Sequence, residues 1–230
     1  MRLAHPMLSS PLHWKEGCVP VLVVEVPEIF RSMVFMLSEQ AQGEEGDFVL
    51  SLDYETLDCA EHMHVLRDLM CLSLDDRKLQ NRFQARLQWT VQEELAVSTH
   101  ALQQHIAEYL QMVAGAVEYP VCFSEGEYVL PLLKALRCQP VLDGTHPLER
   151  LMQYIELYQG LLKNQCFVLV EAHAFFSEKE LCELYRMAAY QKWKLLLMEQ
   201  RLTTPLPQEE ICLLDAGLCE LRLDSNASLL

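Results

Sequence analysis

Hydrophobic residues along the chain follow two spacings, and the change between them divides the sequence. Residues 18–26, 166–171 and 193–199 form short apolar runs rich in Val, Leu and Cys, which predict strands buried on both faces of a parallel sheet. Ser177 and Glu180 have the spacing of a capping box, which predicts a helix between the last two strands. Residues 166–199 therefore predict a strand–helix–strand unit with a right-handed crossover. Weaker strand patterns lie at 48–52, 140–142, 211–214 and 218–223, and helical patterns begin at Pro27 and at His146.

Residues 60–114 have helical spacing and contain neither Gly nor Pro. Their apolar positions predict two long helices, with a break near residues 72–76 where Ser73 or Asp75 caps the second. A loop at 118–127 and a helix at 128–137 follow. We therefore predict an α/β fold with a parallel-sheet head, residues 1–60 and 139–230, and an inserted helical leg with its connecting loop, residues 61–138.

The composition is that of a globular protein. The 230 residues are 51% hydrophobic, which argues against a disordered, collagen-like or coiled-coil chain. Nine cysteines form no CxxC pair, and neither a signal peptide nor a long apolar span is visible. Free thiols of this kind are typical of a reducing compartment, so we expect a cytoplasmic protein without a membrane partner.

The chemistry usually found on a parallel sheet is missing from the sequence. It contains no phosphate-binding G-x-x-x-x-G-K-[ST], no G-x-G-x-x-G and no G-x-S-x-G. Val26, Pro27 and Glu28 follow the first strand, where a nucleotide site would need glycine. An ordinary enzyme is therefore disfavoured, although a scattered active site stays open.

The charges are unevenly placed along an acidic chain. There are 33 Asp and Glu against 18 Lys and Arg, for a net charge of −15, which disfavours a protein that coats nucleic acid with its whole surface. Residues 77–92 nevertheless contain no acid, and they carry Arg77, Lys78, Arg82 and Arg86. Lys78, Arg82 and Arg86 are spaced four apart, so they form a stripe about 12 Å long on one helix face, which could follow a duplex backbone. A solvated face balanced by neighbouring acids is the alternative. Lys134 and Arg137 share a face of the helix at 128–137.

Three acids lie close together in the loop before that helix. Glu118, Glu125 and Glu127 offer hard oxygen ligands of the kind that Ca²⁺ prefers. They lack the spacing of an EF-hand, and an ordinary solvated loop is the alternative.

Three local stretches and the order of the elements resemble a known family. The stretches are CFVLVEAHAFFSEKEL at 166–181, LLLMEQRL at 195–202 and VLPLLKAL at 129–136. They resemble the short-form accessory adaptation protein of type II-A CRISPR systems, a ring-forming family that binds the ends of double-stranded DNA. The resemblance covers residues 3–223.

The resemblance implies both a fold and a function. It implies an α/β head that resembles a P-loop NTPase core without the nucleotide motifs, a helical leg, and a homotetrameric ring that binds DNA ends in a basic central hole. It also implies Ca²⁺ between head and leg, and a non-catalytic role in spacer acquisition, a step of antiviral defence, with the CRISPR integrase proteins and the effector nuclease as partners.

The resemblance also suggests where the site residues lie. The expected DNA contacts are Arg77, Lys78, Arg82, Arg86, Lys134 and Arg137. Glu125 matches an acid of the family's calcium loop, whereas Phe123, Gly126 and Pro131 stand where the family has acids. Glu118 and Glu127 would substitute for them. Two other functions stay open: a degenerate nucleotide-dependent enzyme on the same core, and an acidic protein–protein adaptor that does not bind DNA.

Overall fold

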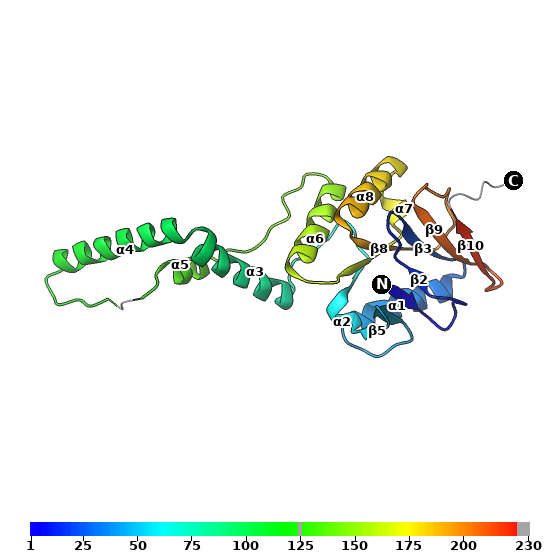
Figure 1. The fold of residues 1–230 in the computed structure, drawn as a ribbon, viewed down its shortest axis with the longest axis horizontal. Helices are drawn as coiled ribbons and strands as arrows, with labels where there is room; N and C mark the ends of the chain where they lie inside the picture. Colours follow the sequence, from blue (N-terminus) through cyan, green and yellow to red (C-terminus); the bar gives the residue numbers. More distant parts are fainter. Residues whose placement is uncertain (124–125, 225–230) are drawn as a thin grey trace. The chain divides into compact units, whose positions relative to one another are not determined.

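The computed structural model describes residues 1–123 and 126–224 and divides the chain into two compact units (Figure 1). Unit 1 comprises residues 1–72 and 142–230, and unit 2 comprises residues 73–141. Unit 1 combines sheets with helices, whereas unit 2 is helical. The predicted mixed α/β class is confirmed. Within the described part of the chain, no helix is both long and apolar enough to span a membrane.

A six-stranded sheet forms the centre of unit 1. Its strands are β3 (Val19–Val24), β6 (Met63–Leu66), β7 (Cys166–Val170), β8 (Lys194–Glu199), β9 (Glu209–Leu214) and β10 (Glu220–Asp224). Their order is β10-β9-β3-β8-β7-β6, in which only β10 pairs antiparallel to its neighbour. The other five strands run parallel to one another. Their carboxyl ends therefore lie at one edge of the sheet, where side chains from distant segments can meet.

Helices cover both faces of this sheet (Figure 1). They are α1 (Pro27–Gln40), α6 (Pro147–Leu161) and α8 (Glu178–Gln191). Met33 and Leu37 of α1 share a buried cluster with alternate strand residues such as Val168. Phe167 faces the opposite side, where its ring centroid lies 6.4 Å from that of Tyr158 in α6. Because successive strand side chains alternate in direction, burial on both faces explains the continuous apolar runs.

The predicted capping box of α8 is confirmed. The Ser177 side chain accepts a hydrogen bond from the Glu180 amide, and the Glu180 carboxylate accepts one from the Ser177 amide at 2.9 Å. The helix connects β7 with β8, which are parallel neighbours. The expected strand–helix–strand unit is therefore present.

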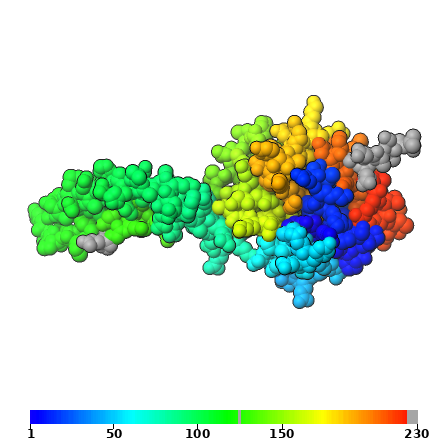
Figure 2. Space-filling view, in the orientation of Figure 1, coloured from blue at the N-terminus to red at the C-terminus, as the bar shows by residue number. Residues whose placement is uncertain are grey.

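A small antiparallel sheet packs beside the same core. It contains β1 (Arg2–Ala4), β2 (Leu12–His13), β4 (Val49–Leu52) and β5 (Glu55–Leu57) in the order β2-β1-β4-β5. Two short helices, α2 (Cys59–His62) and α7 (Ala172–Phe175), complete unit 1. The N-terminal segment, blue in Figure 2, lies against the C-terminal strands, and Arg222 of β10 donates to the Pro11 carbonyl at 3.4 Å.

Strands β1, β2 and β5 were not predicted, and two predicted elements take another form. The helix expected from residue 60 ends at His62, and Met63–Leu66 forms β6, which pairs with β7 at the edge of the sheet. Four apolar or aromatic residues are compatible with either a helix or a strand, and the hydrogen bonds to β7 favour the strand. The strand expected at 140–142 does not form. Pro140 has no amide proton to donate to a strand ladder.

Unit 2 contains one long, interrupted run of helix and a short one. The long run comprises α3 (Arg77–Trp89), a π-helical segment η1 (Thr90–Glu94) and α4 (Ala96–Ala116). Leu95, with φ −109° and ψ 20°, separates η1 from α4. The short helix is α5 (Val129–Ala135), which contacts α4.

Candidate nucleic-acid interface

Asp76 is the N-cap of the basic helix α3. The Asp76 carboxylate accepts hydrogen bonds from the amides of Lys78, at 2.7 Å, and Leu79, at 3.3 Å. The expected caps were Ser73 or Asp75, so the cap lies one residue further along. Asp76 has an extended backbone, with φ −116° and ψ 120°, which lets its side chain reach the first free amides of the helix.

The basic stripe, which we define as Lys78, Arg82 and Arg86, lies exposed along α3 as the spacing predicted. Arg77 precedes it and is also exposed. The first turn of α3 contains no acid, although a helix N-terminus favours negative and disfavours positive charge. Arg77 and Lys78 therefore oppose the helix dipole, and the Asp76 carboxylate at the N-cap lies beside them.

Arg86 occupies the far end of the basic stripe and is held in place by two contacts. Its guanidinium lies 2.9 Å from a carboxylate oxygen of Glu94 and 4.3 Å from the ring centroid of Trp89. The ion pair is exposed, with 54% of the Arg86 side chain accessible. Such pairs contribute little stability in water, so Arg86 can exchange Glu94 for another anion.

Helix α5 places Lys134 beside α3. Lys134 lines a 350 Å³ hollow together with Asn81, Gln84 and Gln88 of α3, and the Gln84 amide nitrogen donates to the Cys138 carbonyl at 2.9 Å. Arg137 is exposed just past α5, in a left-handed conformation with φ 52°. The lining of the hollow is half polar and half apolar, because Ala85, Leu87, Leu130 and Leu133 complete it.

The proposed calcium ligands lie in the segment between α4 and α5. Glu118 and Glu127 are exposed, whereas Glu125 lies outside the described residues. In the part of the chain that the structure describes, no group of three or more His, Cys, Asp or Glu side chains is arranged to hold a metal ion. Two exposed carboxylates do not by themselves make a calcium site, so the site stays a prediction.

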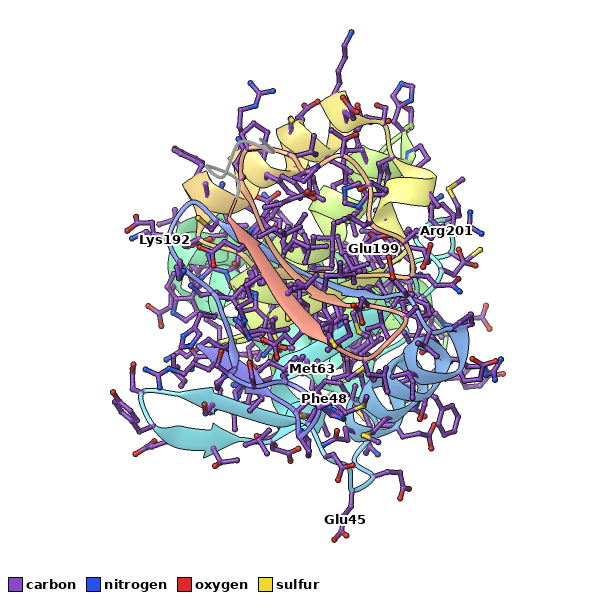
Figure 3. The ribbon with its side chains drawn as sticks, turned by 90° about the vertical axis from the view of Figure 1, so that its right-hand side faces the viewer. Glu45, Phe48, Met63, Lys192, Glu199 and Arg201 are labelled. Atoms are coloured by element: carbon purple, nitrogen blue, oxygen red, sulfur yellow. The ribbon has the colours of Figure 1, made fainter. Side chains whose placement is uncertain are left out.

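The carboxyl edge of the main sheet has the place, but not the chemistry, of a nucleotide site. Glu25, Pro27 and Arg201 help to line a 390 Å³ cavity there, and Arg201 lies near Glu199 in Figure 3. Pro27 begins α1 and Glu28 lies in its first turn. The first position thus offers no amide proton, and the acids at 25 and 28 repel phosphate.

A buried charged cluster beside the main sheet was missed by the sequence predictions. His173 Nδ1 lies 3.1 Å from a Glu199 oxygen, and His173 Nε2 lies 3.0 Å from a Glu209 oxygen. Neither ring nitrogen has the geometry of a hydrogen bond, so both contacts are ion pairs. The Tyr185 hydroxyl donates to Glu209 at 2.7 Å. Burial lowers the pKa of His173, but the two carboxylates outweigh it and raise the pKa to about 9.

This cluster connects three segments of the chain. His173 follows β7, Glu199 ends β8 and Glu209 begins β9, and their side chains are 8%, 4% and 1% exposed. The adjacency of β7 and β8 could have signalled the first pair, because neighbouring parallel strands end side by side. The contact with Glu209 depends on a loop that no pattern specifies.

Comparison with models of known protein families identifies a family. The family model described as CRISPR-associated protein (Cas_Csn2) matches residues 40–216. No curated protein matches the chain. The family match covers β6, β7, β8 and β9 of the main sheet and the whole of unit 2.

Proposed function

The chain belongs to the family of CRISPR-associated proteins described as Cas_Csn2, and from that premise we propose that it binds the ends of double-stranded DNA without catalysing a reaction. It would do so as a homotetrameric ring during spacer acquisition. The CRISPR integrase proteins and the effector nuclease would be its partners.

The observation that carries the proposal is the basic stripe. Lys78, Arg82 and Arg86 are exposed on one face of α3 in a chain whose net charge is −15. Arg77 and Lys78 stand at a helix N-terminus, where cations reduce the stability of a helix by roughly 0.3–1 kcal/mol each. Charges that oppose local stability are often retained for function. A row of cations along a helix suits the phosphates of a duplex backbone.

The exposed apolar residues of unit 2 favour self-association. No side chain of α4 is buried, and large apolar groups are exposed along it, namely Val97, Leu102, Tyr109 and Met112. A 21-residue helix with such a surface gains stability when a partner covers it. We propose that other copies of the chain provide this cover in the ring, and native mass measurements test it.

The carboxyl edge of the main sheet supports a role without nucleotide chemistry. The acids and the proline at the start of α1 replace the glycines and amides that would hold phosphate. Nucleotide binding or hydrolysis by the purified protein would contradict this part of the proposal and favour a degenerate nucleotide-dependent enzyme.

A mobility-shift experiment tests DNA-end binding directly. Linear and covalently closed circular duplexes of one sequence are compared at several salt concentrations. We expect retention of the linear form alone, with log K falling linearly as log salt rises. Equal retention of the two forms would refute end binding. No retention at low salt would refute DNA binding altogether and favour a protein–protein adaptor.

Charge-neutralising variants connect this binding to the basic stripe. We expect the double variant Lys78→Gln, Arg82→Gln to reduce the salt slope by about 1.8, or about 0.9 for each lost phosphate contact. The matched control is Lys163→Gln, Lys179→Gln, which removes two exposed cations of unit 1. Equal slopes for the two double variants would refute the role of the basic stripe.

A further inference from the structure

A second group of cations surrounds a cavity at the opposite, amino-terminal edge of the main sheet. The cavity has a volume of 160 Å³ and is lined by Lys15, Lys192 and Lys194, by the acid Glu16, and by apolar groups such as Ala188 and Trp193. A water molecule occupies about 30 Å³ in the liquid, so the cavity can admit a phosphate group. In Figure 3, Lys192 lies at the left, away from Glu199 and Arg201 toward the right.

Contacts between neighbouring segments hold the lysines near one another. The Trp14 indole donates to the Leu195 carbonyl at 2.6 Å, which places Lys15 beside the start of β8. Lys194 is the first residue of that strand. Two residues before it, Lys192 ends α8 in a left-handed conformation with φ 59°. Gly or Asn would adopt that conformation at lower cost.

Arg2 and Arg222 extend the same surface. Arg2 pairs with His13 in the β1–β2 register, and Arg222 donates to the carbonyls of Ser10 and Pro11 in the segment that leads to His13. Burial lowers the pKa of His13, and the charges of Arg2, Lys15 and Arg222 lower it further. Three cations of this surface therefore lie close enough to His13 to act on its charge.

Acids neutralise part of this surface but leave two of its lysines unpaired. Lys15 lies 2.9 Å from Glu210, and Arg222 lies 2.7 Å from Glu220. Among the residues that the structure describes, neither Lys192 nor Lys194 forms an ion pair. The unpaired charges lie at the wall of the cavity, where a ligand can reach them.

We propose that the amino-edge patch, defined as Arg2, Lys15, Lys192, Lys194 and Arg222, binds the phosphate backbone of DNA. It is a contact surface of unit 1 separate from the basic stripe of unit 2, and the inference rests on the proposed DNA binding. Lysines bind phosphate as point charges and specify no sequence. The patch would therefore add affinity and salt dependence and would not select a sequence.

The experiment compares DNA binding by the full chain and the double variant Lys192→Gln, Lys194→Gln. Linear duplexes of two unrelated sequences are titrated at several salt concentrations. We expect the variant to bind both sequences roughly 10- to 100-fold more weakly at about 0.1 M salt, with a slope reduced by about 1.8. The Lys163→Gln, Lys179→Gln control should retain the wild-type slope.

A charge-retaining variant separates the loss of charge from damage to the fold. Lys192→Arg, Lys194→Arg should restore most of the affinity and slope, and circular dichroism should show the same helix content in all variants. Wild-type binding with an unchanged slope in the glutamine variant would overturn the patch and leave the proposed function intact. Failure of the wild type to bind DNA at low salt would refute both.

Discussion

The buried His173 makes the stability of unit 1 depend on pH in a defined direction. Its ring lies between Glu199 and Glu209 at 3.1 and 3.0 Å. The carboxylates raise its pKa from 6.5 to about 9 against the opposing effect of burial. Protonated histidine is therefore favoured in the folded state more than in the unfolded state.

The size of the effect follows from the shift in pKa. One pKa unit corresponds to about 1.4 kcal/mol, so the protonation of His173 stabilises the folded state by about 3 kcal/mol. A raised pKa gives stability that is fully present below the unfolded pKa, near 6.5, and is lost as the pH rises through the folded pKa, near 9. Above that pH, neutral His173 leaves two buried carboxylates without a counter-charge.

Urea unfolding at several pH values measures this contribution. Trp14 and Trp193 are buried in unit 1, and a Trp89→Phe background removes the tryptophan of unit 2. The free energy of unfolding is compared for the protein with His173 and for the His173→Gln variant, because a glutamine side chain is neutral at every pH. We expect a gap between the two proteins that is largest near pH 6 and about 3 kcal/mol smaller near pH 10.

The gap between the two proteins isolates His173, because other titrating groups change both proteins alike. His62→Gln is the control for a histidine-to-glutamine change outside the cluster, since the His62 ring contacts the Lys163 carbonyl at 3.3 Å. A gap that stays constant from pH 6 to pH 10 would refute the proton linkage and leave His173 with a packing role alone.

Three further predictions concern the cap of α3, the same buried cluster and the thiols. Replacement of the N-cap, Asp76→Ala, should destabilise unit 2 by about 1 kcal/mol in urea unfolding followed by Trp89 fluorescence, whereas Asp75→Ala should not. Tyr185→Phe removes a donor 2.7 Å from a buried carboxylate and should reduce the stability of unit 1 by about 1–3 kcal/mol; an unchanged urea midpoint would contradict this. Burial raises the pKa of the thiols of Cys59, Cys166 and Cys212. These thiols should react with Ellman's reagent only after unfolding, and earlier labelling of any of them would disprove their protection.

The strands of unit 1 were predictable because both of their faces are apolar. Residues 166–171 and 193–199 could not leave one side in water, so their composition indicated interior strands, and β7 and β8 each have a neighbouring strand on both sides. The edge strand β6 was missed because Met63–Leu66 is only partly buried. Its state is decided by hydrogen bonds to β7, which begins about 100 residues further along the chain.

The candidate site was predictable only where it depends on one helix. Lys78, Arg82 and Arg86 lie on one face because residues four apart do so on any α-helix. The amino-edge patch combines β1, the segment after β2, β8 and β10, so its formation depends on the strand order and on loop paths. The same holds for His173, Glu199 and Glu209, which meet only after β7, β8 and β9 have assembled.

The charge of −15 and a role in DNA binding are compatible because the cations are concentrated. Arg77, the three residues of the basic stripe and the five of the amino-edge patch make up half of the 18 lysines and arginines. The rest of the chain keeps most of its 33 acids and repels duplex. Binding confined to two small surfaces depends on few phosphates, so modest increases in salt should release the DNA. Under the proposed function, an acidic surface would exclude non-productive contacts and leave the basic surfaces as the sites where a duplex docks.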